Sequence, residues 1–593
     1  MSKKKNSVFM LMFVLLLTKV LGFLKLRIFA QLFGASHELD IFWAAFTIPD
    51  IIFMVLLAGS INAAIIPILS DELYDKGKSS LNILFLKLTK YFFLICLLVV
   101  LLIFLFAPTI TSWIVDNNYV QTVLGLGFRL DISDYDLFLL LFRIGLLSPL
   151  LLSVSAFVTA YLQVRKQFFV ASLAPLFYNI AMIVGTYILV KIFDFGVLGI
   201  AISAIIGSFA HLVIQLPKLL RYFRDKTKEK TQQIKDNYDN NRVVKAFKLA
   251  FPRMLGILGE QLNTIVNTFI SFTLSAGALS AYKFAFSLHM FPVSIVGSAI
   301  AQVALPDLAK CSSRKEDSEF RKVLNNSIQL ALYLVLPIVG VMFVLRLPIV
   351  RLIYGTGAFD WQDTLLTAWS LALLSVSIIG QTVVQILLRA FYALKDTWKP
   401  LIAISFGIVI NLLGAYYLTN FFSHYYDWRP ILEQIWIQLS QANGRGVLPV
   451  VNSFFQDFLR WSTTRGESNL AVGGLALSLS LAYLVQTVVS FFILGRVKKV
   501  LSWQDTIYPL LMKTVNTLIM MLGMYFVFKL FDFKLDTTRT VSIIVLTGAV
   551  SLYGGISYLI GSRIFSPKEY KMSLNILKRI MGKITNGHNL VNS

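Results

Sequence analysis

Long apolar stretches recur along almost the whole chain of 593 residues. Because roughly 20 consecutive apolar residues cross a bilayer as a helix, stretches of this length predict membrane-spanning helices. A transmembrane β-barrel would show short alternating segments instead. The sequence therefore predicts an all-α polytopic membrane protein with about fourteen transmembrane helices, near residues 8–33, 41–69, 84–108, 137–163, 169–191, 196–217, 246–275, 280–306, 323–350, 363–390, 399–421, 469–495, 505–530 and 540–562.

Composition and charge agree with this class. The chain is 57% hydrophobic and carries a formal net charge of +23. In a soluble protein that charge would suggest nucleic acid, but in a membrane protein the positive-inside rule explains it. Lys and Arg gather in alternate loops, most densely in residues 218–248. This asymmetry predicts that both termini lie in the cytoplasm and that no nucleic acid is bound.

The two halves of the chain share landmarks. Gly34 precedes Pro49 by the same number of residues as Gly277 precedes Pro292. Six helices followed by six in the same orientation predict two lobes around a central cavity that holds the substrate. The predicted parts are an N-terminal lobe (1–217), a basic cytoplasmic connector (218–245), a C-terminal lobe (246–495), helices 13 and 14 (496–562) and a basic cytoplasmic tail (563–593).

Residues 421–469 interrupt the pattern as an extracytoplasmic insertion. Pro430–Ser440 and Pro449–Trp461 place apolar residues at helical spacing and are rich in aromatic residues. This pattern fits helices lying on the outer membrane surface. A small cap on the mouth of a transporter and a dedicated binding role remain open as alternatives.

Cations inside the first apolar stretch point to an anionic ligand. Lys19, Lys25 and Arg27 lie in a span where a cation near the centre costs about 2.5–3.5 kcal/mol on insertion scales. Such a charge survives if it faces a watery cavity or meets an anion. Lys19 and Lys25 diverge by about 120° on a straight helix. We therefore expect a bend near Gly22 if both face one cavity.

Further polar residues and a helix-bending proline in the spans are candidates for the cavity and its gates. Asp40, at the extracytoplasmic start of the second span, is expected either to pair with a cation of the first span or to be solvated. Arg253 and Glu260 share a helix face and could belong to one network or form a structural pair. Lys513 lies near the cytoplasmic end of its span and is expected to be an anchor. The remaining candidates are Thr18, Pro49 and Asn62.

Sequence patterns typical of enzymes are missing. The chain has no phosphate-binding Gly-rich loop ending in Lys-Ser/Thr, no HExxH and no CxxC pair. The five histidines are scattered and predict no metal site. We expect a transporter rather than an enzyme, without a cofactor.

Several of these segments resemble one known family. The stretch from Thr18 to Lys25, Phe33-Gly34-Ala35, Asp40 and Phe391–Asp396 are similar to the MurJ/MviN family of lipid II flippases, in the multidrug/oligosaccharidyl-lipid/polysaccharide exporter superfamily. The resemblance implies transfer of an undecaprenyl-pyrophosphate-linked precursor from the inner to the outer leaflet of the bacterial inner membrane, for peptidoglycan synthesis and cell shape. It also implies alternating access of two lobes, a groove for the lipid tail on helices 13 and 14, and a cation gradient or membrane potential as driving force.

The resemblance also assigns residues. The family's two cavity arginines in the first span are Lys19 and Lys25 here, and the arginine expected in the eighth span falls at Ser287, one turn from Lys283. The implied pyrophosphate site is therefore Lys19, Lys25 and Lys283. The arginine expected in the second span falls at Phe53, so the cationic cavity is thinned.

Other functions remain open from the sequence. The chain could move another polyprenyl-linked oligosaccharide, or act as a drug/cation antiporter of the same superfamily. It could also be a non-transporting membrane scaffold for cell-wall synthesis. The expected partners are the lipid-linked oligosaccharide, membrane lipids and a coupling cation, and we expect a monomer.

Overall fold

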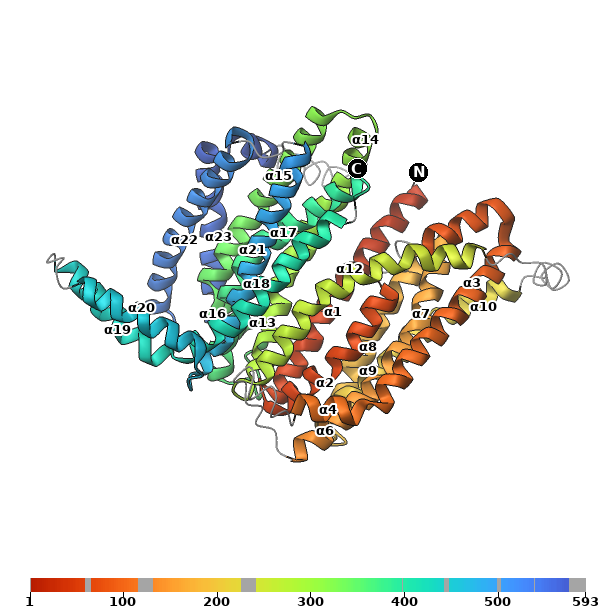
Figure 1. Ribbon diagram of the computed structural model, residues 1–593, viewed down its shortest axis with the longest axis horizontal. Helices are drawn as coiled ribbons and strands as arrows, with labels where there is room; N and C mark the ends of the chain where they lie inside the picture. Colours follow the sequence, from red (N-terminus) through yellow and green to blue (C-terminus); the bar gives the residue numbers. More distant parts are fainter. Residues whose placement is uncertain are drawn as a thin grey trace, which may run out of the picture. The chain divides into compact units, whose positions relative to one another are not determined.

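The computed structural model describes residues 2–58, 65–115, 132–224, 241–396, 398–441, 447–498, 503–537 and 539–574. These residues form helices joined by turns, with no strand among them (Figure 1). The predicted all-α fold is confirmed. The chain divides into two compact units: unit 1 is Met1–Ser280 with Tyr354–Asp363, and unit 2 is Ala281–Ile353 with Thr364–Ser593.

Unit 1 contains the helices of the first half of the chain. They are α1 (Ser2–Phe33), α2 (His37–Phe53), α3 (Ile66–Leu105), α4 (Ala107–Val115), α6 (Ile132–Gly145), α7 (Leu147–Val164), α8 (Phe168–Lys191), α9 (Gly196–Val213), α10 (Leu216–Arg224) and α12 (Asn241–Phe272).

Unit 2 contains the helices of the second half, apart from the first turn of α13 and Tyr354–Asp363, which fold with unit 1. The latter segment comprises the last residue of α16, the turn that follows it and the first three residues of α17. The helices of the second half are α13 (Ala278–Pro292), α14 (Ser298–Ser313), α15 (Asp317–Val344), α16 (Arg346–Tyr354), α17 (Trp361–Ala393), α18 (Trp398–Ser423), α19 (Tyr425–Ser440), α20 (Val447–Thr463), α21 (Val472–Lys498), α22 (Tyr508–Lys534) and α23 (Thr540–Phe565).

The number of helices able to cross a membrane is close to the prediction. Within the described ranges, 12 helices are long and apolar enough to do so. The helices α1 and α12, of 32 residues each, coincide with the first and seventh predicted spans. The chain is therefore a multi-pass membrane protein.

The glycine and proline residues shared by the two halves occupy corresponding backbone positions. Gly34 and Gly277 have φ angles of +62° and +83°, and each lies in the turn that leads into α2 or α13. Both helices contain the proline of the pattern and continue as a π-helical turn, at Met54–Ala58 and Val293–Gly297. Such wide turns often mark functional segments. The helix α1 runs continuously through Gly22, so the bend considered there remains a prediction.

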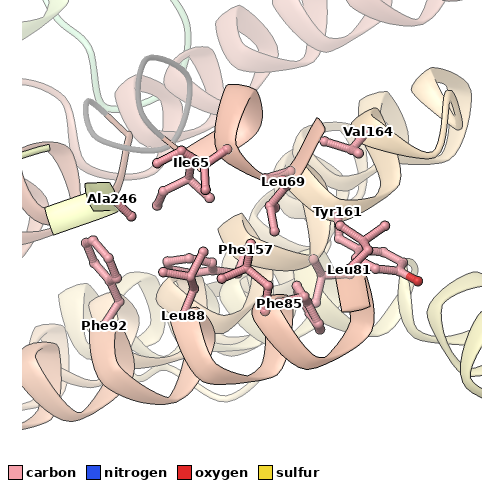
Figure 2. Close-up of a cluster of buried hydrophobic side chains, with 14 of the residues drawn as sticks. Ile65, Leu69, Leu81, Phe85, Leu88, Phe92, Phe157, Tyr161, Val164 and Ala246 are labelled. Carbon is pink, nitrogen blue, oxygen red and sulfur yellow. The ribbon is translucent and has the colours of Figure 1, made fainter. Parts of the chain in front are cut away.

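A core of large apolar side chains holds α3, α7 and α12 together within unit 1. Figure 2 shows Phe85, Leu88 and Phe92 of α3 facing the same cluster as Phe157 and Tyr161 of α7. The rings of Phe92 and Phe247 are stacked, with centroids 4.4 Å apart. Lipid tails are as apolar as these side chains, so close packing stabilises the cluster more than exclusion from water does.

Small residues allow close helix approach in unit 2. A Cβ atom added to Gly414 of α18 would lie 2.9 Å from the Cβ of Ser478 in α21.

The last two helices contact α15. The Oη of Tyr558 in α23 donates a 3.0 Å hydrogen bond to the backbone oxygen of Tyr333 in α15. The last two helices are therefore packed on α15 rather than separate from the rest of unit 2.

Candidate functional site

The first helix lies against α8, and this packing positions its polar residues. The Nδ2 of Asn179 in α8 donates a 3.3 Å hydrogen bond to the backbone oxygen of Thr18. The hydroxyl of Thr18 donates to the backbone oxygen of Val14 at 2.8 Å. A threonine in this state satisfies its donor within its own helix, which slightly loosens that turn. Thr18 therefore has a structural contact beside the predicted cations.

Lys25 is the predicted cation with the best-defined surroundings. Its half-buried side chain places Nζ 5.7 Å from the centroid of the Tyr178 ring in α8. Asp50 of α2 is the acidic group that interacts electrostatically with it. The Tyr178 ring is backed by Gly207 of α9, where an added Cβ would lie 3.1 Å from the ring. The ammonium group thus lies near an aromatic face and interacts with one carboxylate from another helix.

Lys19 has different surroundings. Its side chain is exposed, whereas Lys25 and Arg27 are half-buried. Beside it on α1, a Cβ atom added to Gly22 would have no atom within 4 Å. The surface of α1 at Gly22 is therefore open.

Asp40 corrects the sequence-based expectation. Its side chain is 2% exposed, so it is not solvated, and it accepts hydrogen bonds from neutral groups rather than pairing with a cation of α1. Oδ2 accepts from the backbone N–H of Gly277 at 2.7 Å. Oδ1 accepts from the backbone N–H and the hydroxyl of Ser280, at 2.7 and 2.6 Å. The expectation failed because the partners lie more than 230 residues away in the sequence.

Three turns from distant parts of the chain meet within unit 1. We call residues 31–40, 273–280 and 354–363 the turn junction. The backbone N–H of Ala35 donates to Asp363 Oδ2 at 2.8 Å, and that of Ala358 donates to the backbone oxygen of Gln31 at 2.9 Å. A Cβ added to Gly277 would lie 1.9 Å from the backbone oxygen of Ala35. The junction therefore depends on glycine at a positive φ and on two buried or half-buried carboxylates.

The other predicted residues are dispersed. Pro49 is buried in α2, and Glu260 is exposed on α12. Lys283 and Ser287 are half-buried on α13 and belong to unit 2. Asn62 and the side chain of Arg253 lie outside the described residues. A common site for Lys19, Lys25 and Lys283 remains a prediction.

Lys513 is not the exposed anchor that its position suggested. It is 1% exposed, and its Nζ lies 2.6 Å from Glu569 Oε1 and 2.5 Å from Gln329 Oε1. These groups line a cavity of about 1180 Å³ in unit 2, between α14, α15, α22 and the residues after α23. The hydroxyl of Ser566, another lining residue, is buried without a hydrogen-bond partner.

Several of these contacts could not be found by sequence reasoning. Tyr178 is one of 23 tyrosines, many of them in apolar spans, and nothing in its local sequence distinguishes it. Ser280 and Asp363 begin apolar spans, where polar residues are ordinary. Among the residues that the structure describes, no group of three or more His, Cys, Asp or Glu side chains could hold a metal ion.

Comparison with known proteins gives a consistent result. The family model described as "Lipid II flippase MurJ" matches residues 29–426, more than half of the chain. A "Probable lipid II flippase MurJ" of Buchnera aphidicola subsp. Acyrthosiphon pisum is 28% identical over 411 residues, which cover 69% of this chain and 77% of that protein. A "Lipid II flippase MurJ" of Burkholderia cenocepacia is 25% identical over 414 residues, which cover 69% and 77%.

Solved structures support the same fold. A structure described as "Lipid II flippase MurJ, inward closed conformation" has a TM-score of 0.66 and 21% identity, covering 94% of this chain and 98% of that chain. A multidrug resistance MATE family transporter in an inward-facing conformation has a TM-score of 0.57 and 13% identity, covering 81% and 94%. At these identities the structures show a shared fold.

Proposed function

The chain belongs to the lipid II flippase MurJ family, and from this we propose that it moves a lipid-linked peptidoglycan precursor from the inner to the outer leaflet of the bacterial cytoplasmic membrane. The substrate of this proposal is a lipid II-like undecaprenyl-pyrophosphate oligosaccharide. The observation that carries the proposal is Lys25, whose ammonium group lies 5.7 Å from the Tyr178 ring centroid and interacts electrostatically with Asp50.

The chemistry of the substrate matches this cation. A pyrophosphate is anionic, and its attraction to an ammonium group is stronger in the membrane interior than in water. We propose that Lys19, Lys25 and Lys283 contact the pyrophosphate. Lysine keeps the charge of the family's arginines but lacks their bidentate fork, so these contacts are less directional. Arg27, Glu260 and Ser287 are proposed to line the same path.

Translocation also needs a closure that opens. We propose that the turn junction is the extracytoplasmic closure, because Asp40 and Asp363 join the starts of α2, α13 and α17 through bonds that can be broken without unfolding a helix. The proposed topology has both termini in the cytoplasm and a monomeric unit. A cation gradient or the membrane potential would supply the energy.

The test is depletion of the protein in its native cells, followed by measurement of lipid-linked precursors on each leaflet. We expect lipid II to accumulate in the inner leaflet and to become accessible outside again when the intact chain is restored. Restoration with Lys25→Gln should fail, whereas restoration with Lys191→Gln, an exposed lysine at the end of α8, should succeed. If no lipid-linked intermediate accumulates, the proposal is wrong.

The same experiment separates the alternatives. Accumulation of a different polyprenyl-linked sugar would indicate another flippase substrate. Full rescue by a variant carrying both Lys19→Ala and Lys25→Ala would favour a scaffold. Export of a soluble compound in a cation gradient, with normal lipid-linked sugars, would favour an antiporter.

A further inference from the structure

The helices α19 and α20 lie almost entirely beyond the part of the chain that the family model matches. The match ends at residue 426, and α19 begins at Tyr425. The structure confirms that both amphipathic segments of the 421–469 insertion are helical, as Tyr425–Ser440 and Val447–Thr463. The pair, which we call the hairpin, therefore lies almost wholly outside the family-model match, and its role needs its own argument.

The base of the hairpin is fixed to the end of α18. Asn420 Nδ2 donates to the backbone oxygen of Ser462 at 3.3 Å, and the backbone N–H of Gly466 donates to Ser423 Oγ at 2.7 Å. The indole of Trp428 stacks on Phe421, with ring centroids 5.1 Å apart. These hydrogen bonds and ring contacts fix the direction of the hairpin relative to α18.

Beyond this base, both helices expose apolar stripes. On α20, the exposed residues are three or four positions apart and so share one face: Leu448, Val451, Phe455 and Leu459, which are 75%, 44%, 61% and 55% exposed. On α19, Leu432, Trp436 and Leu439 form a similar stripe, with Trp436 73% exposed. Contiguous exposed apolar faces of this kind mark interaction surfaces.

The charged side chains of the hairpin pair with one another locally. Asp457 and Arg460 are 3.5 Å apart on the side of α20 away from its stripe. Arg429 and Glu433 are 3.1 Å apart on α19. Because positive and negative charges nearly balance, the hairpin has no charge pattern that would recognise an acidic or basic partner. The surface that it offers to a partner is therefore apolar and includes aromatic rings.

The helix from which the hairpin extends is itself long and apolar enough to cross a membrane. The helix that carries the hairpin, α18, exposes Phe406, Val409, Leu413 and Tyr417 along its length, as a membrane-spanning helix does toward lipid. Figure 1 shows the hairpin leaving the end of this helix and running across the direction of α22 and α23. We infer that the hairpin lies in the lipid–water interface, with the apolar stripes of α19 and α20 inserted among the lipids. In the topology proposed above this is the outer leaflet.

Depth measurements on the full-length protein in lipid nanodiscs test this inference. Spin labels are placed at Phe455→Cys on the stripe and at Ser453→Cys on the opposite face, in a background where the buried Cys96 and Cys311 are replaced by Ala. The label at 455 should collide readily with oxygen, which concentrates in lipid, and poorly with a water-soluble nickel complex. The label at 453 should show the reverse order.

Other outcomes contradict the inference. If both labels collide readily with the nickel complex, the hairpin projects into water. If the label at 455 is shielded from both reagents, protein covers the stripe, from a second copy or from another chain. The variant Phe455→Leu, which keeps the apolar face, should give unchanged protein yield and serves as the folding control. The result does not depend on which substrate the protein moves.

Discussion

Asp40 and Ser280 are joined by two hydrogen bonds, of 2.7 Å to the backbone N–H and 2.6 Å to the hydroxyl, although 240 positions separate them. Ser280 lies in the first turn of α13, where unpaired backbone N–H groups and the helix dipole favour a negative charge. A buried carboxylate at this point therefore has hydrogen-bond donors for its oxygens and stabilises the start of α13. It ties the start of the eighth predicted span to the second.

The variant Asp40→Asn tests this tie. An amide can accept both bonds from Ser280 through its oxygen, but its NH₂ group then opposes the N–H of Gly277. We expect a loss of about 1.5–3 kcal/mol of stability, the range for a hydrogen bond to a charged group. Thermal unfolding of the purified protein measures it. Glu38→Gln, two positions away and exposed, is the control and should leave the midpoint unchanged. Equal midpoints for the two variants would contradict the proposed link between Asp40 and Ser280.

Most of the fold could be predicted because apolar length alone decides what enters a membrane. Helix ends were less predictable, since hydropathy detects only the part inside the bilayer. The helix assignment of α3, for example, runs from Ile66 to Leu105 and includes the charged residues around Gly77, where φ is +84° and the axis kinks. The hairpin was predicted from its periodicity, because amphipathic spacing is a local signal.

The site was less accessible to sequence reasoning. Lys19 and Lys25 were found because a charge in an apolar stretch is conspicuous. The surroundings of Lys25 could not be predicted, because Tyr178 and Asp50 come from other helices. Lys513 was misjudged for the same reason: Glu569, which accounts for its burial, lies 56 positions later, beyond the end of α23.

Glycine at 277 gives a second prediction. An added Cβ would lie 1.9 Å from the backbone oxygen of Ala35, and φ is +83°. We expect Gly277→Ala to lower the thermal midpoint strongly. The added Cβ would overlap with backbone atoms, which cannot move aside as the end of a flexible side chain can, and alanine is strained at this φ angle. Gly548→Ala in α23, where an added Cβ meets no atom within 4 Å, should leave the midpoint equal or higher. Matching midpoints for the two variants would show that the turn junction is loose.

The contact of Lys25 with Tyr178 gives a third prediction. Lys25→Gln removes the cation and should reduce precursor transport by about tenfold or more, the equivalent of one charged hydrogen bond. Lys25→Arg should retain transport. Tyr178→Phe keeps the aromatic face and should be close to normal, whereas Tyr178→Leu removes the cation–π attraction, worth about 0.5–2 kcal/mol, and should be weaker. Equal transport by the Phe and Leu variants would show that the ring only fills space.

The buried pair of Lys513 and Glu569 gives the last prediction. Lys513→Met leaves the Glu569 carboxylate, 17% exposed, facing an apolar side chain, and should destabilise the protein by about 3–5 kcal/mol. Glu569→Gln should cost less, because its amide oxygen can still accept from Lys513. The double variant should lose less stability than the sum of the two single variants, since removing both charges leaves neither unpaired. Thermal unfolding of the four proteins measures the coupling, with Lys529→Met, an exposed lysine of the same helix, as the control. Additive losses would mean that Lys513 is stabilised mainly by Gln329 and by packing rather than by the carboxylate.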